Sequence, residues 1–229
     1  MMVSMTQMDW FALGFFLIAW VLFEYVNDHS PLRNKALSSI MARRRRAWML
    51  EMARRDLRMI DTQILQGLQN GAAYFGSASI LAIGGCFALL GATDQVLEIY
   101  QDLPVDVDIP RQLFELRVFG LTTIVVYSFF KFGWAYRLFN YCSILVGAVP
   151  MCDQADEDTR KKAALEAAEM NIIASRHFNA GLRGIFFALA YLGWFIGPLT
   201  LCFSTVFVMA VLTRRNYFSA ARAIVAKTD

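Results

Sequence analysis

Four charged side chains lie inside or beside long apolar stretches of the chain: Glu24, Lys131, Arg137 and Arg183. A charge at the centre of a membrane span is costly, so such a residue usually has a partner or a task. If the apolar stretches cross a membrane in turn, all four side chains fall toward the same membrane face. Polar residues near the ends of the same stretches then complete one candidate polar cluster: Asp61, Gln63, Asn70, His177 and Asn179.

This candidate polar cluster has three interpretations. In the first interpretation, the side chains of Lys131 and Arg137 extend along their apolar stems to the membrane surface, and Glu24 is a lone acid at the membrane interface. Alternatively, a fixed network of ion pairs and hydrogen bonds ties the helix ends together. In the third interpretation the cluster binds a solute or an ion. The residue types and their spacing leave all three open.

Catalytic and metal-binding patterns are not evident in the sequence. Asp28, His29 and His177 are the one acid-plus-histidine set of note, and neither histidine has another ligand at i+3 or i+4, as a zinc site on a helix would. The four cysteines form no C-x-x-C pair and are expected to be small buried thiols. No serine lies in a G-x-S-x-G setting, and no glycine loop that could hold a phosphate precedes a helix. The sequence predicts no enzyme activity and no cofactor.

The elements that must position these residues are hydrophobic helices. The chain is 57% hydrophobic, whereas soluble domains are about 45–50% apolar. Its apolar residues gather in blocks long enough to cross a bilayer. We expect an all-α, polytopic helical membrane protein that forms a single domain over residues 1–229. The predicted spans cover residues 10–26, 71–91, 118–138 and 184–212. The first block lacks a signal-peptide pattern and is taken as a retained span.

The last two apolar blocks are longer than a membrane requires. One helix over residues 111–149 would be roughly 58 Å long, against a hydrocarbon core of about 30 Å. We therefore expect this helix to project from the membrane. The fourth block contains Gly197 and Pro198, and a proline inside a helix removes a backbone hydrogen bond. A kink or a break is predicted at these two residues.

A run of four arginines, Arg43 to Arg46, lies between the first and second spans. It belongs to a predicted basic helix over residues 38–66, and a second polar helix is expected over residues 153–175. The positive-inside rule puts both helices in the cytoplasm of an inner-membrane protein. Four spans then put both termini outside. In the alternative, a hairpin at Gly197 and Pro198 returns the basic tail to the cytoplasm.

The arginine run is expected to contact anionic lipid headgroups through Arg43, Arg44, Arg45 and Arg46. Docking of a protein partner is the alternative. Nucleic-acid binding is not expected, because no recognition motif accompanies these arginines. Gly67 and Gly71 form a G-x-x-x-G spacing, which suits close helix packing within the chain or between copies in a homo-oligomer.

Three segments resemble an uncharacterised four-span membrane protein family of bacteria and plants, a domain of unknown function. They are DTQILQGLQNGAAYFGSASILAIGG, YSFFKFGWAYRLFNYCSILVG and RHFNAGLRGIFFALAYLGWFIGP. The similarity extends from about Arg43 to Tyr217. This resemblance implies a four-span membrane fold, and it implies no established activity.

Two functional hypotheses follow. The charged residues in the spans and the broken fourth block favour a component of a small-solute or ion transporter or channel. The basic helix and the lack of catalytic motifs favour a non-catalytic scaffold or lipid-interacting protein. A polar cavity lined by Glu24, Lys131 and Arg183 would favour transport.

Overall fold

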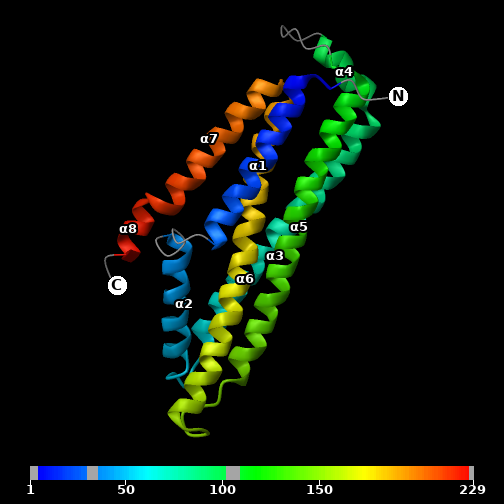
Figure 1. Cartoon of the computed structure of the whole chain (residues 1–229). Coiled ribbons are helices and arrows are strands. Elements are labelled where there is room, and N and C mark those ends of the chain that lie inside the picture. The colour runs from blue at the N-terminus through cyan, green and yellow to red at the C-terminus, as the bar shows by residue number, and fades with distance from the viewer. Residues whose placement is uncertain (1–4, 30–35, 102–108, 227–229) are drawn as a thin grey trace.

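The computed structural model describes residues 5–29, 36–101 and 109–226, and every regular element in these ranges is a helix. This confirms the all-α fold. The elements, in chain order, are α1 (Gln7–His29), α2 (Leu37–Met52), α3 (Met59–Gly91), α4 (Thr93–Gln101), α5 (Arg111–Ala148), α6 (Glu157–Tyr191), the 3-10 turn η2 (Leu192–Phe195), α7 (Pro198–Tyr217) and α8 (Ala220–Ala226) (Figure 1).

Four of the described helices are long and apolar enough to cross a membrane: α1, α3, α5 and the segment formed by α7 and α8. Large apolar side chains on α3 and α7 point outward. Leu81 of α3 is 77% exposed and Phe203 of α7 is 75% exposed. Such exposure is unfavourable in water and favourable in lipid. The chain is therefore a multi-pass membrane protein.

Helices α5 and α6 form the centre of the bundle and run antiparallel. Small residues of α6 let the two helices approach closely. A Cβ atom added at Gly181 would lie 2.7 Å from the ring of Phe132, and Gly184 lies against Ser128. Further along, the Cys142 thiol donates a hydrogen bond to the carbonyl of Ala167 at 3.4 Å.

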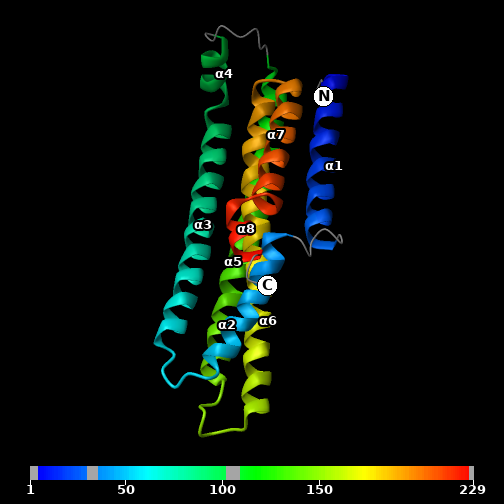
Figure 2. The ribbon, with the colours of Figure 1, turned by 90° about the vertical axis from the view of Figure 1, so that its left-hand side faces the viewer.

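The other long helices cover this central pair from two sides. Helix α3 packs on α5, whereas α1 and α7 pack on each other and on α6. Figures 1 and 2 show α3 on one flank of the α5–α6 pair and α1 on the other. Helices α1, α5 and α7 run in one direction, and α3 and α6 run in the opposite direction.

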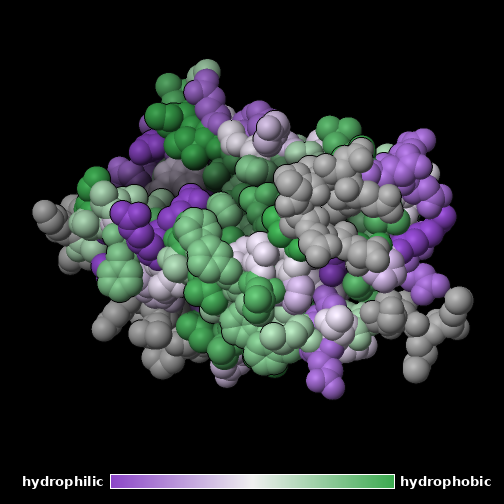
Figure 3. Space-filling view, turned by 90° about the horizontal axis from the view of Figure 1, so that it is seen from above, coloured by the Kyte–Doolittle hydropathy of each residue, from purple (hydrophilic) through white to green (hydrophobic). Residues whose placement is uncertain are grey.

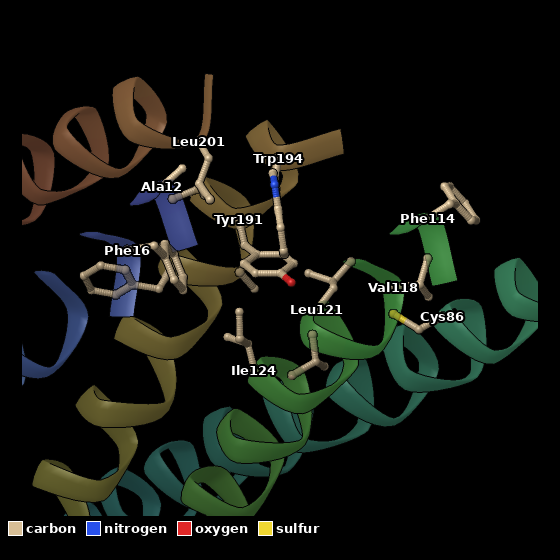
Figure 4. Close-up of a cluster of buried hydrophobic side chains, with 14 of the residues drawn as sticks. Ala12, Phe16, Cys86, Phe114, Val118, Leu121, Ile124, Tyr191, Trp194 and Leu201 are labelled. Carbon is tan, nitrogen blue, oxygen red and sulfur yellow. The ribbon is translucent and has the colours of Figure 1, made fainter. Parts of the chain in front are cut away.

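The hydrophobic core near the α4 end of the bundle joins α1, α3, α5, α6 and α7 (Figure 4). Tyr191 of α6 lies between Phe16 of α1 and Leu121 of α5, and Leu201 of α7 closes the cluster. The ring centroids of Phe16 and Tyr191 are 5.4 Å apart in an edge-to-face arrangement. Seen from this end, hydrophobic residues fill the middle of the surface and hydrophilic residues its margins (Figure 3).

The predicted basic helix over residues 38–66 is two helices in the structure. Helix α2 ends at Met52, a turn follows, and α3 begins at Met59. Side chains from distant segments fix this turn. Arg58 donates to the carbonyl of Pro150 at 2.8 Å, and Arg160 donates to the carbonyl of Ala53 at 3.0 Å. Periodicity alone could not indicate this turn, because its partners lie about a hundred residues later in the chain.

The second predicted polar helix, over residues 153–175, is the first half of α6. The carboxylate of Asp156 caps its first turn by accepting a hydrogen bond from the backbone N–H of Thr159 at 3.3 Å. Hydrogen bonds from Thr159 lower the pKa of Asp156. From there α6 continues without interruption to Tyr191.

The predicted fourth span, residues 184–212, is not one helix. Helix α6 ends at Tyr191, η2 follows, and α7 begins at Pro198. The chain then folds back, so that the Ser204 hydroxyl donates to the Ala190 carbonyl at 2.6 Å. Pro198 has no N–H and stands at the first position of α7, where none is needed. Gly193 permits the close approach, because a Cβ atom there would lie 2.9 Å from the Thr200 carbonyl oxygen.

The contact between Gly181 and Phe132 yields a test of the central packing. Phe132 is fully buried and stacks on Phe75 at 5.3 Å, so its ring cannot move aside for a methyl group. We expect Gly181→Ala to lower the free energy of unfolding by about 1–3 kcal/mol, measured by thermal unfolding in detergent. The control is Gly133→Ala, where an added Cβ meets nothing within 4 Å and alanine favours the helix. Equal melting temperatures for the two variants would contradict this account of the packing.

Candidate functional site

An ion pair between Glu24 of α1 and Arg183 of α6 lies in the middle of the molecule. The Nε atom of Arg183 donates to one carboxylate oxygen at 3.0 Å, and its Nη2 atom donates to the other. The Arg183 side chain is 15% exposed and the Glu24 side chain 20%. Two parallel hydrogen bonds between a guanidinium and a carboxylate fix both distance and orientation. The pair therefore ties α1 to α6.

A partly enclosed cavity of about 320 Å³ lies beside this ion pair. Three arginines from three helices line it: Arg45 of α2, Arg183 of α6 and Arg215 of α7. The described residues that line it include no aspartate or glutamate. We call this space the basic cavity.

The rest of the basic cavity is half polar and half apolar. The uncharged polar residues that line it are Asn27, Ser38, Ser175, Asn179 and Asn216. The apolar residues that line it are Phe23, Leu37, Met41, Leu182, Phe186 and Leu212. Such a lining suits a ligand that has both a charged end and an apolar end.

Arg45 is a partly buried cation with a neutral partner. Its Nη1 atom donates to the side-chain oxygen of Asn171, which is fully buried. The Asn171 amide in turn lies 3.5 Å from the sulfur of Cys142. Burial lowers the pKa of Arg45. Within the described ranges Arg45 forms no ion pair, so its charge remains uncompensated.

Arg215 is exposed and lines the basic cavity. Its guanidinium carbon lies 5.5 Å from the ring centre of Phe186, a cation–π contact. No carboxylate of the described chain lies within ion-pair distance of it. Of the three arginines, Arg183 is therefore paired with Glu24, and Arg45 and Arg215 have no acidic partner among the described residues.

Two side chains of the arginine run bind α6, and a third binds α8. Arg45 and Arg46 bind α6, and the hydrogen bond between Arg46 and Glu169 raises the pKa of Arg46. Arg44 donates to a backbone carbonyl of α8 at 3.5 Å, and Arg43 is exposed. Helix α2 thus packs along α6 through arginines that the sequence suggested for lipid contact.

Two hydrogen-bonded amides, of Asn27 and Asn216, line the basic cavity where α1 meets α7. The Asn216 amide donates to the side-chain oxygen of Asn27 at 2.7 Å, and the Asn27 amide donates to the Phe23 carbonyl at 2.8 Å. The Tyr217 hydroxyl lies 3.5 Å from the same Asn27 oxygen. These bonds hold the ends of α1 and α7 together.

A second ion pair, between Asp9 and Arg117, is buried near the other end of α1. It was not predicted from the sequence. One oxygen of Asp9 accepts from Trp194 Nε1 at 2.8 Å and from Arg117 Nη2 at 3.3 Å. The other oxygen accepts from the Thr6 hydroxyl at 2.6 Å. Both charged side chains are 4% exposed. No sequence motif marks this pair, because Asp9 and Arg117 are 108 positions apart in the chain.

Three members of the candidate polar cluster lie away from the basic cavity, near the start of α3. Asp61 is fully buried and accepts from Trp48 Nε1 at 2.7 Å and from Arg55 at 3.0 Å. Gln63 and Asn70 are exposed on α3. The structure does not bring these residues to the Glu24–Arg183 pair.

Three more members contact aromatic rings. Lys131 Nζ lies 5.2 Å from the ring centre of Tyr127, and Arg137 donates to the Tyr141 hydroxyl at 2.7 Å. The His177 ring lies edge-on to Trp134 at 6.4 Å. The candidate polar cluster is therefore dispersed. Glu24, Arg183 and Asn179 are its members at the basic cavity.

The described residues hold no group of three or more histidine, cysteine, aspartate or glutamate side chains placed to bind a metal. The side chains of Asp28 and His29 lie outside the described part of the chain. The four cysteines are free thiols.

The buried Asp9–Arg117 pair generates a prediction about stability. Asp9→Asn removes the negative partner and leaves Arg117 buried and charged, so we expect a loss of about 3–5 kcal/mol in unfolding free energy. The matched control is Asp94→Asn at the same end of the molecule. Asp94 pairs with Arg111 at 2.8 Å but is 70% exposed, and such surface pairs contribute about 0–1 kcal/mol. Thermal unfolding in detergent measures the stability of both variants. Similar losses of unfolding free energy in Asp9→Asn and Asp94→Asn would contradict the stabilising role of the buried pair.

One comparison with known proteins identifies the family of the chain. Residues 11–221 match the family model described as "Protein of unknown function, DUF599". No curated protein and no solved structure matches the chain. The match covers most of the chain and confirms the resemblance of its three membrane segments to an uncharacterised membrane family. The chain belongs to the DUF599 family.

Proposed function

We propose that this protein is a non-catalytic membrane protein that binds an anionic amphiphile, such as a lipid, in the basic cavity. The observation that carries the proposal is the convergence of Arg45, Arg183 and Arg215 on a partly enclosed space that apolar side chains also line. Two of these cations have no acidic partner among the described residues, and a bound anion would supply one. The apolar side chains would hold the start of an acyl chain.

The depth of the basic cavity supports a lipid ligand. Phe132 of α5 packs against both Gly76 of α3 and Gly181 of α6. The exposed aromatics Tyr74 and Trp134 lie two residues, about 3 Å along a helix axis, to one side of this contact, and Arg183 lies the same distance to the other side. Exposed tyrosine and tryptophan on membrane helices favour the headgroup region. The basic cavity then lies close to headgroup depth, with Arg183 on the side of the apolar layer.

Solute transport has less support. That hypothesis required Glu24, Lys131 and Arg183 to line one polar cavity. Arg183 lines the basic cavity and Glu24 is paired with it, whereas Lys131 lies over Tyr127 on α5 and does not line the cavity. One of the three charges that motivated a transport path therefore lies outside the cavity.

We also propose that the chain crosses the inner membrane five times. Helix α6 runs back between α5 and α7, both of which point the opposite way, so its second half must traverse the same layer. The positive-inside rule then puts the basic α2 in the cytoplasm together with Arg214, Arg215 and Arg222 of the tail. The N-terminus lies outside. This arrangement corresponds to the hairpin alternative of the sequence analysis.

The five-crossing arrangement predicts the side of the C-terminus. A fluorescent reporter that folds only in the cytoplasm, fused after residue 229, should fluoresce at full strength. The same reporter fused after Gly91, at the far end of α3, should be dark. A dark C-terminal fusion in a stably inserted protein would place the C-terminus outside. With the N-terminus also outside, the chain would then cross the membrane an even number of times, which contradicts five crossings.

The proposed ligand site predicts which arginines matter for lipid binding. Arg45→Gln and Arg215→Gln each remove one uncompensated charge, and hydrogen bonds to charged groups typically change affinity by about tenfold or more. We expect each variant to retain correspondingly less anionic phospholipid in native mass spectrometry from detergent. The matched control is Arg137→Gln, on the outward surface of α5. If all three variants retain as much lipid as the parent chain, the basic cavity does not bind it.

A further inference from the structure

We infer that the basic cavity is matched to a phosphate monoester headgroup, with Glu24 limiting the free positive charge to two. This inference rests on the proposed function and specifies the ligand's chemical class. It concerns the ligand's charged end, which is contacted by the arginines, and not its apolar end.

The charge count comes from the three arginines. The carboxylate of Glu24 accepts two hydrogen bonds from Arg183, which neutralises that guanidinium. Arg45 binds the neutral Asn171, and Arg215 lies over the ring of Phe186. Among the described residues, no carboxylate pairs with Arg45 or Arg215, so these two charges are the ones that the ligand would balance.

A phosphate monoester balances this charge better than a diester. A monoester carries about −1.5 to −2 charges at neutral pH and has three acceptor oxygens. A diester, as in phosphatidylglycerol, carries one charge and has two free oxygens. Guanidinium groups bind phosphate through paired hydrogen bonds, so Arg45 and Arg215 together can use all three oxygens of the monoester.

The burial of the two arginines agrees with a ligand that enters from the exposed side of the cavity. Arg215 of α7 is exposed, whereas Arg45 of α2 is partly buried. Asn179 and Ser38 add uncharged polar groups to the lining. Arg183 stays paired with Glu24, so that it supports the wall without adding charge.

The test measures binding of three probes to the full chain in detergent micelles: phosphatidic acid, phosphatidylglycerol with the same acyl chains, and glycerol 3-phosphate. We expect phosphatidic acid to bind at least about tenfold more tightly than phosphatidylglycerol. Arg215→Gln leaves one free charge and should bring the two lipids to within about threefold of each other. Equal affinity of the parent chain for both lipids would overturn the inference.

A second arm tests Glu24 itself. Glu24→Gln removes the carboxylate that binds Arg183 in the basic cavity and should tighten phosphatidic acid binding by about tenfold. The matched control is Glu169→Gln, which frees Arg46 outside the cavity and should leave the affinity unchanged. An unchanged affinity in a folded Glu24→Gln protein would overturn the role of Glu24. If that variant does not fold, the Arg215→Gln comparison decides the inference alone.

The outcomes separate this inference from the proposed function. If both lipids bind equally and Arg45→Gln weakens both, the inference fails and lipid binding stands. If neither lipid binds and the arginine variants have no effect, both fail. If glycerol 3-phosphate binds as tightly as phosphatidic acid, the monoester specificity stands and the ligand is a soluble ester instead of a lipid.

Discussion

The structure depends on one constraint: in the five-crossing arrangement that we propose, a helix with polar residues at the membrane boundary has to pass through the apolar layer. Helix α6 carries Asn179 and Arg183 at that boundary and Asn171 before it, and Asn171 and Arg183 find partners inside the protein. The bundle meets this requirement by surrounding α6. Helix α5 packs on its small residues, α1 supplies Glu24, and α2 supplies Arg45. Because other helices shield α6, it does not need the continuous apolar surface of a lipid-exposed span. Hydropathy therefore identifies α1, α3, α5 and α7 as spans but not α6.

The break between α6 and α7 and the basic cavity are parts of the same arrangement. Because α7 folds back along α6, Arg215 returns to the level of Arg183 and faces α2 across the cavity. At the opposite end the Trp194 indole, next to the break, donates to Asp9 and anchors the turn to α1. Helix α1 thus has an acid near each end, and each acid is held by a tryptophan or an arginine from later in the chain. These two anchors fix the cavity walls.

Much of the fold could be predicted from the sequence. Blocks of apolar residues predict the lipid-exposed helices, and the excess length of residues 111–149 predicts a helix that projects beyond the membrane. The combination of Gly197 with Pro198 indicates where the fourth block breaks. Periodicity could not indicate that the chain reverses there, because the reversal depends on contacts such as that of Ser204 with Ala190. At the site, Glu24, Arg183 and Asn179 were predictable as polar residues at one depth. Arg45 and Arg215 were counted as topological charges, since their convergence depends on packing between helices more than a hundred residues apart.

The pairing of α1 with late segments has a consequence for biosynthesis. Asp9 and Glu24 leave the ribosome about a hundred residues or more before their cationic partners, Arg117 and Arg183. Helix α1 is therefore made before either cationic partner exists. Only when α6 inserts can both acids of α1 be paired, and only then can α7 close over α1. A nascent chain that stops before α6 therefore leaves Glu24 without Arg183.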